Sequence, residues 1–302
     1  MLGLLKTNRH VFVVFAGLGI LAGCGDEGNG GTGAGGTGGT GGTGGQEPVA
    51  VEIQFEARVG AEAFNCGTKY AGLGSAKSEM ELSDFRLYIH DVTLMKADGT
   101  VAVVELEQDG LWQYQNLALL DFENKAGACA NGTTEINTKI KGKAPPGPYA
   151  GVSFVVGVPF ALNHGDAATA PSPLNLTALF WSWNEGYKFM RVDGAATGAM
   201  GPFLMHLGST ACNADAMGNV TACDRPNRPT VDLMGFDPLV GKVVIDYAAL
   251  VSKADLSKNA GGAPGCMSGS DDPECASTMG NLGIHVVDGS IHADEQTVFR
   301  GE

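Results

Sequence analysis

The sequence predicts an all-β protein, an antiparallel β-sandwich with long disulfide-bearing loops. The first sign is Val51–Val59, where apolar and polar residues alternate with the period of two that marks a half-buried strand. Several later segments are rich in β-forming residues and end at glycine, proline or aspartate turn signals. Convincing amphipathic helices are few, and the sequence has no internal repeat of about 20–50 residues.

The expected strands follow one another with turns between them. Phe85–Met95 leads through the hairpin signal Asp98-Gly99 to a return strand at 101–106. Tyr149–Phe160 is an almost continuous apolar run after three prolines, which predicts a central strand buried on both faces. Thr177–Gly194 would hold two strands, or a short helix that enters a strand. Further strands are expected at 202–210, 229–237 and 241–251, a glycine-rich loop at 260–283, and a last strand or loose tail at 283–302.

The N-terminus has the anatomy of an export signal. Lys6 and Arg9 form a basic head, and the apolar run Val11–Ala22 is too short for a membrane span. The run ends in Leu-Ala-Gly-Cys, which matches the bacterial lipobox, so we expect residues 1–23 to be a signal peptide and Cys24 to be lipidated. The alternative is an uncleaved N-terminal membrane anchor.

Residues 24–48 are expected to act as a tether between the lipidated cysteine and the folded domain. The segment is almost entirely glycine and threonine, and such a chain is a flexible coil with a root-mean-square span of about 26 Å. A phosphate-binding loop is excluded because no lysine follows the glycines. Residues 49–302 then form one β domain.

The charge balance excludes one class of partner. The chain has 19 Lys and Arg against 33 Asp and Glu, a formal net charge of −14. Nucleic acid binding is not expected, because phosphates need basic side chains. Acidity is compatible with cation binding, although it usually serves solubility alone.

Six cysteines remain after Cys24, an even number in an exported chain, so we expect disulfides. We favour the pairs Cys212–Cys223 and Cys266–Cys275, because each flanks a polar loop, which leaves Cys66 with Cys129. Six cysteines allow 15 connectivities, so spacing does not fix the pairing. A thiolate metal cluster is the alternative, but no Cys-x-x-Cys spacing supports it.

Trp181 and Trp183 form the most distinctive pair in the chain. Two residues apart in an extended strand, both indoles would stand on one face. His164 precedes them and His206 follows them, so the segment resembles a binding site bracketed by two imidazoles. The plainer interpretation is an aromatic core with two hydrogen-bonded histidines.

Other chemistry finds little local support. No Gly-x-Ser-x-Gly elbow marks a hydrolase, and no context marks a catalytic carboxylate pair. The absence of His-Glu-x-x-His disfavours a zinc protease. Copper suits imidazole ligands, and His90 in Phe85–Met95 is a further candidate beside His164 and His206.

Several motifs together resemble one known family. They are the lipobox, Cys66 and Cys129, and the segments VPFALNH, FWSWNEGYKFMRVDG and HLGSTAC. The order of these motifs is similar to that in the metallo-mystery pair four-Cys-motif family of MbnP-like lipoproteins, over about Val51–Val251. Cys266 and Cys275 lie beyond the four-cysteine pattern and are interpreted as an added loop disulfide.

The resemblance implies a mechanism and a set of residues. In the family, a di-haem MauG-like enzyme oxidises a tryptophan to kynurenine, and the modified protein binds copper through histidines. His164 and His206 match the family histidines, and Trp181 or Trp183 would be the oxidised residue. Trp112 is interpreted as core. Asp166 would either orient His164 or remain in solvent.

We therefore expect a copper-binding protein that is not itself an enzyme, anchored by lipid to the outer membrane of a bacterial envelope, on its periplasmic or outer face. Its expected partner is the di-haem cytochrome. The alternative is a surface sandwich that binds carbohydrate or protein through Trp181, Trp183 and Tyr187, with structural histidines. An exported hydrolase is a third possibility.

Overall fold

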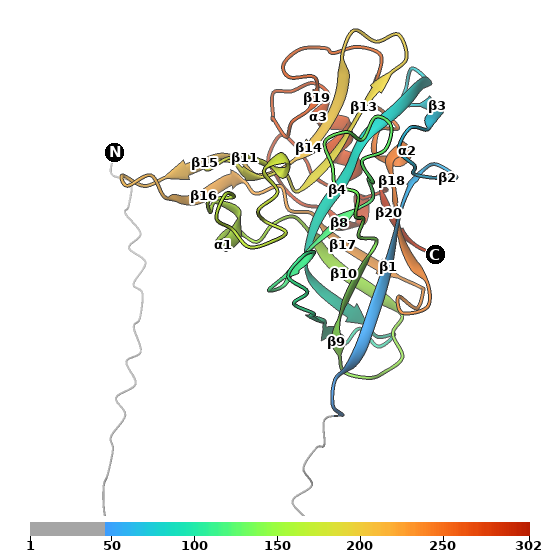
Figure 1. The fold of residues 1–302 in the computed structure, drawn as a ribbon, viewed down its shortest axis with the longest axis vertical. Helices are drawn as coiled ribbons and strands as arrows, with labels where there is room; N and C mark the ends of the chain where they lie inside the picture. The colour runs from blue at the N-terminus through green and yellow to red at the C-terminus, as the bar shows by residue number, and fades with distance from the viewer. Residues whose placement is uncertain (1–45) are drawn as a thin grey trace, which may run out of the picture. The chain divides into compact units, whose positions relative to one another are not determined.

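A computed structural model describes residues 46–302 and places two β-sheets against one common core (Figure 1). The expected signal peptide, Cys24 and the tether as far as Gly45 lie outside the described residues. Among the residues described, no helix has the length and apolar character needed to cross a bilayer.

The first sheet is built around β1 (Val49–Val59), whose alternation puts Ile53, Phe55 and Ala57 inside and their neighbours at the surface. Its order is β20 (Phe299–Gly301), β18 (Lys242–Asp246), β1, β9 (Lys139–Ala144) and β6 (Glu105–Leu106), with β2 (Glu62–Ala63) paired to β1. β1 and β18 are parallel neighbours, although almost 200 residues separate them in sequence: Gln54 pairs with Lys242.

The second sheet is organised by β4 (Ser78–Met95), an 18-residue strand. Its main order is β17 (Thr230–Met234), β10 (Gly151–Val156), β4, β13 (Met190–Ala196), β14 (Pro202–Leu207) and β19 (Gly265–Cys266). The remaining strands are β3 (Lys69–Leu73), β5 (Val101–Val103), β7 (Gln113–Tyr114) and β8 (Leu117–Asp121). The predicted all-β sandwich is confirmed, with two parallel pairs, β1–β18 and β14–β19.

Aromatic rings join the two sheets. Phe55 of β1 contacts Phe154 of β10 edge to face, with ring centroids 5.7 Å apart, and Phe299 of β20 meets the same Phe154 at 5.6 Å. All three side chains are buried, and each such burial stabilises the fold by about 2–3 kcal/mol. The sheets are therefore held by side chains that alternate inward from both.

Most expected elements have structural counterparts. The apolar run at 149–160 forms β10, which is central between β4 and β17, and then α1 (Phe160–Asn163). The Thr177–Gly194 segment contains η1 (Thr177–Leu179), β11 (Phe180–Ser182), β12 (Gly186–Tyr187) and the start of β13. It combines both sequence-based alternatives, a short helix entering a strand and paired strands.

The expectation of a plain loop at 260–283 was wrong. This segment contains β19 and α3 (Cys275–Asn281), which bury both cysteines of the disulfide that joins them. Glycine content predicted loop, but Met279 and Leu282 give the short helix an apolar face. The other short helices are α2 (Tyr247–Leu250), capped by the Asp246 side chain, and η2 (Ala293–Glu295).

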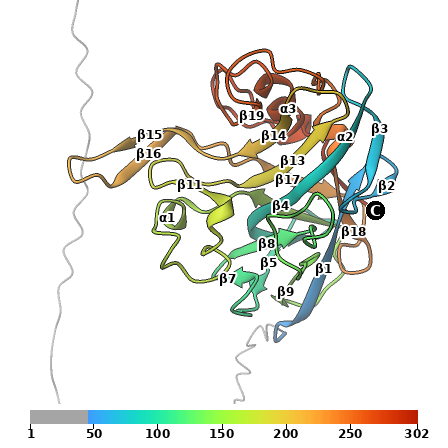
Figure 2. The same ribbon diagram turned by 45° about the horizontal axis from the view of Figure 1, so that its top comes forward.

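Three disulfides join Cys66 to Cys129, Cys212 to Cys223 and Cys266 to Cys275, the pairs that the sequence favoured. The second lies across the hairpin of β15 (Thr210–Ala214) and β16 (Val220–Arg225), where the two cysteines are register partners. In both ribbon views this hairpin projects from the sheets beside β11 and α1 (Figures 1 and 2).

Candidate metal centre

His164 lies where α1, the β11–β12 turn and the β15–β16 hairpin meet. Its Nδ1 is 3.2 Å from the backbone oxygen of Trp183. A carbonyl oxygen only accepts hydrogen bonds, so Nδ1 carries the hydrogen and Nε2 keeps its lone pair. Burial lowers the pKa of His164, which keeps the ring neutral at pH 7. A neutral imidazole with a fixed tautomer is the form that binds metals.

His164 Nε2 has two neighbours, an amide nitrogen and a sulfur atom, and both lie at the long end of contact distance. Asn163 Nδ2 lies 3.2 Å away, and the Sγ atom of Cys223 lies 3.7 Å away. His164, Cys212 and Cys223 offer ligand atoms within 4.8 Å of one another, but both sulfurs are held in a disulfide and are not thiolates. With the disulfide formed, His164 is the one metal-binding side chain of this group, and the disulfide packs against its ring.

Asn163 fixes the position of His164 by joining α1 to β12. Its Oδ1 accepts a hydrogen bond from the backbone N–H of Tyr187 at 3.0 Å. Gly186 has a φ of +79°, and a Cβ there would come within 2.3 Å of the backbone oxygen of Asn163. Glycine is therefore required for the close approach of the two segments.

Trp183 shares an open pocket with His164. The pocket has a volume of about 480 Å³, and its other walls include Phe160, Asn219 and Val220. Trp183 is 55% exposed, because it follows the last residue of β11 and enters the turn. The two side chains thus face a common solvent-accessible space.

Trp181 occupies a different environment beside His206. Its half-buried ring lies so close to Gly208 that a Cβ there would be 2.4 Å from Trp181 Cζ3. Its ring centroid is 6.1 Å from that of His206. The two tryptophans were equivalent in the sequence. In the structure, Trp181 is half-buried beside His206, whereas Trp183 is exposed.

His206 is tied to Asp193, with Nε2 2.8 Å from the carboxylate Oδ1. Burial opposes ionisation of Asp193, but the hydrogen bond from His206 and the charges of His206 and Arg191 outweigh it and lower the pKa of Asp193. His206 Nδ1 is buried and has no hydrogen-bond partner among residues 46–302.

His206 belongs to a row of buried charges that crosses the second sheet. Arg191 bonds Asp193 at 2.7 Å and approaches Asp84 at 3.1 Å, and Asp84 in turn bonds Arg86. Beyond Arg86, burial raises the pKa of Asp121 to about 8, so that carboxyl is largely protonated at pH 7. The row fixes Asp193 through Arg191, and Asp193 in turn holds His206.

His90 in β4 has the arrangement typical of a metal-binding imidazole. Its Nδ1 lies 2.8 Å from Asp91 Oδ2, and its buried Nε2 has no partner in the described part of the chain. Burial lowers the pKa of His90, so the ring is neutral with its lone pair on Nε2. A carboxylate on one nitrogen and a bare nitrogen on the other is the pattern of a carboxylate–histidine–metal triad.

Arg228 connects His90 and His164 electrostatically, because its positive charge lowers the pKa of both. The guanidinium donates from Nε to the Val158 oxygen and lies 4.8 Å from the centre of the Phe189 ring. Arg228 and Asn163 were not among the residues expected from the sequence. Nothing in the local pattern singles out Arg228, whereas Asn163 is at least the residue before His164.

The three predicted histidines do not form one cluster. Within residues 46–302, no group of three or more possible ligands includes more than one of them. His206 pairs with Arg191, which pairs with Arg86, so His206 and His90 lie two strands apart and four residues along. That offset separates their backbones by about 16 Å, too far for one ion between side chains that stand perpendicular to the sheet. Each tryptophan instead has its own histidine.

Three other expectations can be placed. Trp112 is half-buried against the core, as expected. Asp166 accepts hydrogen bonds from Ala168 and Thr169, and the Trp183 carbonyl orients His164 in its place. Tyr187 is fully buried with its hydroxyl on the Leu174 oxygen, so it cannot join a carbohydrate-binding platform.

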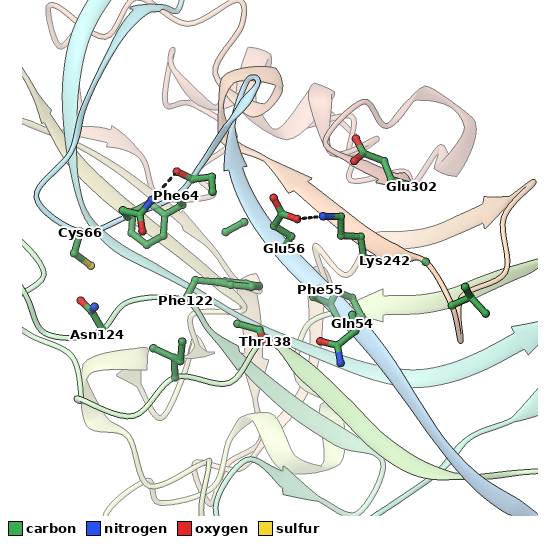
Figure 3. Close-up of a pocket in the computed structure, with 16 residues that line it drawn as sticks. Gln54, Phe55, Glu56, Phe64, Cys66, Phe122, Asn124, Thr138, Lys242 and Glu302 are labelled. Carbon is green, nitrogen blue, oxygen red and sulfur yellow. Dashed lines mark hydrogen bonds and ion pairs between the residues drawn. The ribbon is translucent and has the colours of Figure 1, made fainter.

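A larger pocket of about 730 Å³ lies away from these histidines, along β1 (Figure 3). Phe64 and Phe122 form its apolar wall, and the Glu56–Lys242 ion pair crosses one side. Its lining, all within residues 54–302, contains no histidine.

Comparisons with known proteins identify the family of this chain. The family model for MbnP matches residues 48–268. The solved structure of MbnP from Methylosinus trichosporium is similar, with a TM-score of 0.72 and 30% sequence identity over 83% of this chain and 94% of that chain. A comparison with curated proteins gave no match. On the family match and this structural similarity, the chain belongs to the MbnP family.

Proposed function

We propose that this chain is an exported, lipid-anchored copper-binding protein that is not itself an enzyme. The observation that carries the proposal is the pairing of His164 with Trp183 in one open pocket. Family membership supports a metal-related role. The expected tether would let the domain reach outward from the membrane.

The available donors suit copper. Imidazole nitrogens are good copper ligands, and the nitrogens at His164 Nε2 and His90 Nε2 keep their lone pairs at neutral pH. We assign His164 as the copper ligand beside Trp183, and His90, whose buried Nε2 has no partner among residues 46–302, as a separate candidate ligand. His206 is then the neighbour of Trp181, held by Asp193.

We propose Trp183 as the residue that becomes kynurenine. The expected oxidant is a secreted di-haem MauG-like enzyme, which would draw electrons from an indole close to its docking surface. The indole would lose four electrons and four protons, which the partner enzyme would pass to two equivalents of hydrogen peroxide, and two water molecules would supply the oxygen atoms that cleave the C2–C3 bond to give N-formylkynurenine. Hydrolysis then releases formate. The product has an aniline nitrogen and a ketone beside His164 where the indole offered no lone pair. Trp183 suits this step because its side chain is the more exposed.

The alternative of a carbohydrate-binding surface loses one of its three aromatic residues, since Tyr187 is buried. The direct test is to express the chain with its di-haem partner, and in parallel with a partner whose haem-attachment cysteines are replaced. Elemental analysis of the purified chain should give stoichiometric copper only with the intact partner. A copper-free chain with intact tryptophans after exposure to the active partner would refute the proposal.

A further inference from the structure

A second cluster of possible metal ligands lies near the C-terminus, beyond the residues 48–268 that match the family model. It consists of His285, His292 and Glu295, which offer ligand atoms within 4.8 Å of one another. No role was expected for these residues from the sequence. The cluster is separate from His164 and Trp183 in composition, since it shares no residue with their pocket.

The backbone brings the two histidines together. Ile284 and Ile291 form an antiparallel bridge, and the N–H of His285 donates to the Ser290 oxygen at 3.0 Å. The N–H of His292 donates to the Gly283 oxygen at 2.8 Å. Gly283 has a φ of +75°, and a Cβ there would come within 2.3 Å of the His292 oxygen. The hairpin therefore fixes both imidazoles on one side, and η2 places Glu295 beside them.

Glu295 lies against both rings. Its Oε2 is 2.8 Å from His285 Nε2, and its Oε1 is 3.7 Å from His292 Nδ1. The rings are stacked, with centroids 4.0 Å apart and planes 18° apart. All three side chains are between 39% and 49% exposed, so a cation can reach them from solvent.

The hydrogen bonds around Ser290 determine which nitrogen of His292 faces Glu295 without a hydrogen. The Ser290 hydroxyl donates to Asp288 Oδ1 at 2.7 Å. The Ser290 oxygen is then free to accept from His292 Nε2–H at 3.0 Å. This leaves a lone pair on His292 Nδ1, directed to the side of a carboxylate oxygen. Two negative poles 3.7 Å apart are unfavourable, and a cation between them would remove the repulsion.

We propose that His285, His292 and Glu295 form a second metal site that binds a divalent first-row transition ion such as Zn²⁺ or Cu²⁺. Two imidazoles and a carboxylate are a common donor set for these ions, and water would complete the coordination. Binding replaces the proton that His285 shares with Glu295. The ligand atoms must then move to about 3–3.5 Å from one another, which rotations of these exposed rings allow.

The test uses the purified full chain, expressed without the di-haem partner and freed of metal by a chelator. Zn²⁺ binding is measured by isothermal titration calorimetry, and Co²⁺ is used as a coloured probe of ligand geometry. The wild-type chain should bind Zn²⁺ at this site, and His292→Ala and Glu295→Gln should weaken that binding at least about tenfold. Glu107→Gln is the matched control away from both candidate sites and should leave Zn²⁺ binding unchanged, while His164→Ala removes the other candidate ligand so that the remaining binding can be assigned.

Ser290→Ala provides a milder probe, because it keeps all three ligands and removes only the group that fixes the His292 tautomer. It should weaken Zn²⁺ binding less than His292→Ala does. Equal Zn²⁺ affinity in wild type, His292→Ala and Glu295→Gln would overturn the proposal and leave the cluster as a salt-bridged turn. Loss of Zn²⁺ binding in His164→Ala with retention in His292→Ala would also overturn it. Because no partner enzyme is present, these outcomes do not depend on whether the copper proposal holds.

Discussion

The Nδ1 atom of His164 lies 3.2 Å from the backbone oxygen of Trp183, so the chain segment that carries the exposed indole also sets the histidine tautomer. The two residues are 19 apart in sequence and are joined through Asn163 and the tight approach of Gly186. The free lone pair on His164 Nε2 therefore depends on how the β11–β12 turn packs against His164.

Gly186→Ala should destabilise the fold and displace His164. The added Cβ would meet the Asn163 oxygen and amide, and an alanine at this positive φ costs about 1–2 kcal/mol before the clash is counted. We expect a total loss of about 3 kcal/mol in the free energy of unfolding, measured by urea denaturation. Gly218→Ala is the matched control, because φ is +89° there and no atom lies within 4 Å of its Cβ. Equal losses in both variants would show that the contact with Asn163 is unimportant.

Replacing Cys212 and Cys223 by serine should loosen the wall beside His164. Opening this short loop should cost about 3 kcal/mol of stability in the chain-entropy view. We also expect weaker copper binding, because Cys223 Sγ contacts the imidazole. The Cys266→Ser, Cys275→Ser double variant opens a loop of similar length elsewhere and should lower stability without changing copper affinity. Unchanged copper affinity in the Cys212→Ser, Cys223→Ser variant would show that this disulfide does not contribute to the copper site.

Stability should fall as the pH drops below about 6.5, partly because of His90. Burial lowers the pKa of His90 in the folded state, so the unfolded chain takes up a proton first as the pH falls. The contribution of His90 to the free energy of unfolding is complete above the unfolded pKa of about 6.5 and is lost as the pH falls toward the pKa of the folded state. His90→Gln, which cannot titrate, should show a shallower decline in urea-unfolding free energy between about pH 7 and pH 5. Parallel curves for the two proteins would contradict the prediction.

Asp193→Asn should be strongly destabilising. Asp193 is buried and accepts from His206 and Arg191, so the neutral amide leaves Arg191 with less compensating charge. Loss of one partner from a buried ion pair costs about 3–5 kcal/mol. Glu107→Gln, an exposed acid-to-amide change, should stay within about 0.5 kcal/mol of wild type in thermal unfolding. A mild effect of Asp193→Asn would mean that the row of charges does not hold His206.

Local patterns in the sequence were enough to predict the fold class. The alternation in Val51–Val59 and the apolar run before Phe160 correspond to β1 and β10, and polar loops pointed to the disulfide pairs. The parallel pairing of β1 with β18 could not be predicted, because it joins strands far apart in sequence. Local periodicity contains no information on such a pairing.

The candidate site was predicted less completely, because its geometry depends on contacts between distant segments. Trp181 and Trp183 are indistinguishable by spacing, but in the structure Trp181 is half-buried against Gly208 and Trp183 is exposed. His206 and His164 were both expected as ligands from the family resemblance, yet each has a different tryptophan as its neighbour. Arg228 acts on His90 and His164 from a third segment with no recognisable motif.

The most direct measurement is peptide mapping by mass spectrometry of the chain after exposure to the proposed di-haem partner enzyme, with copper content determined on the same samples. We predict kynurenine at residue 183 in the wild-type chain and in Trp181→Phe, with stoichiometric copper in both. Trp183→Phe should lack both the modification and the copper. Kynurenine at residue 181, or full copper loading of Trp183→Phe, would contradict the assignment of Trp183 and His164 as the copper site.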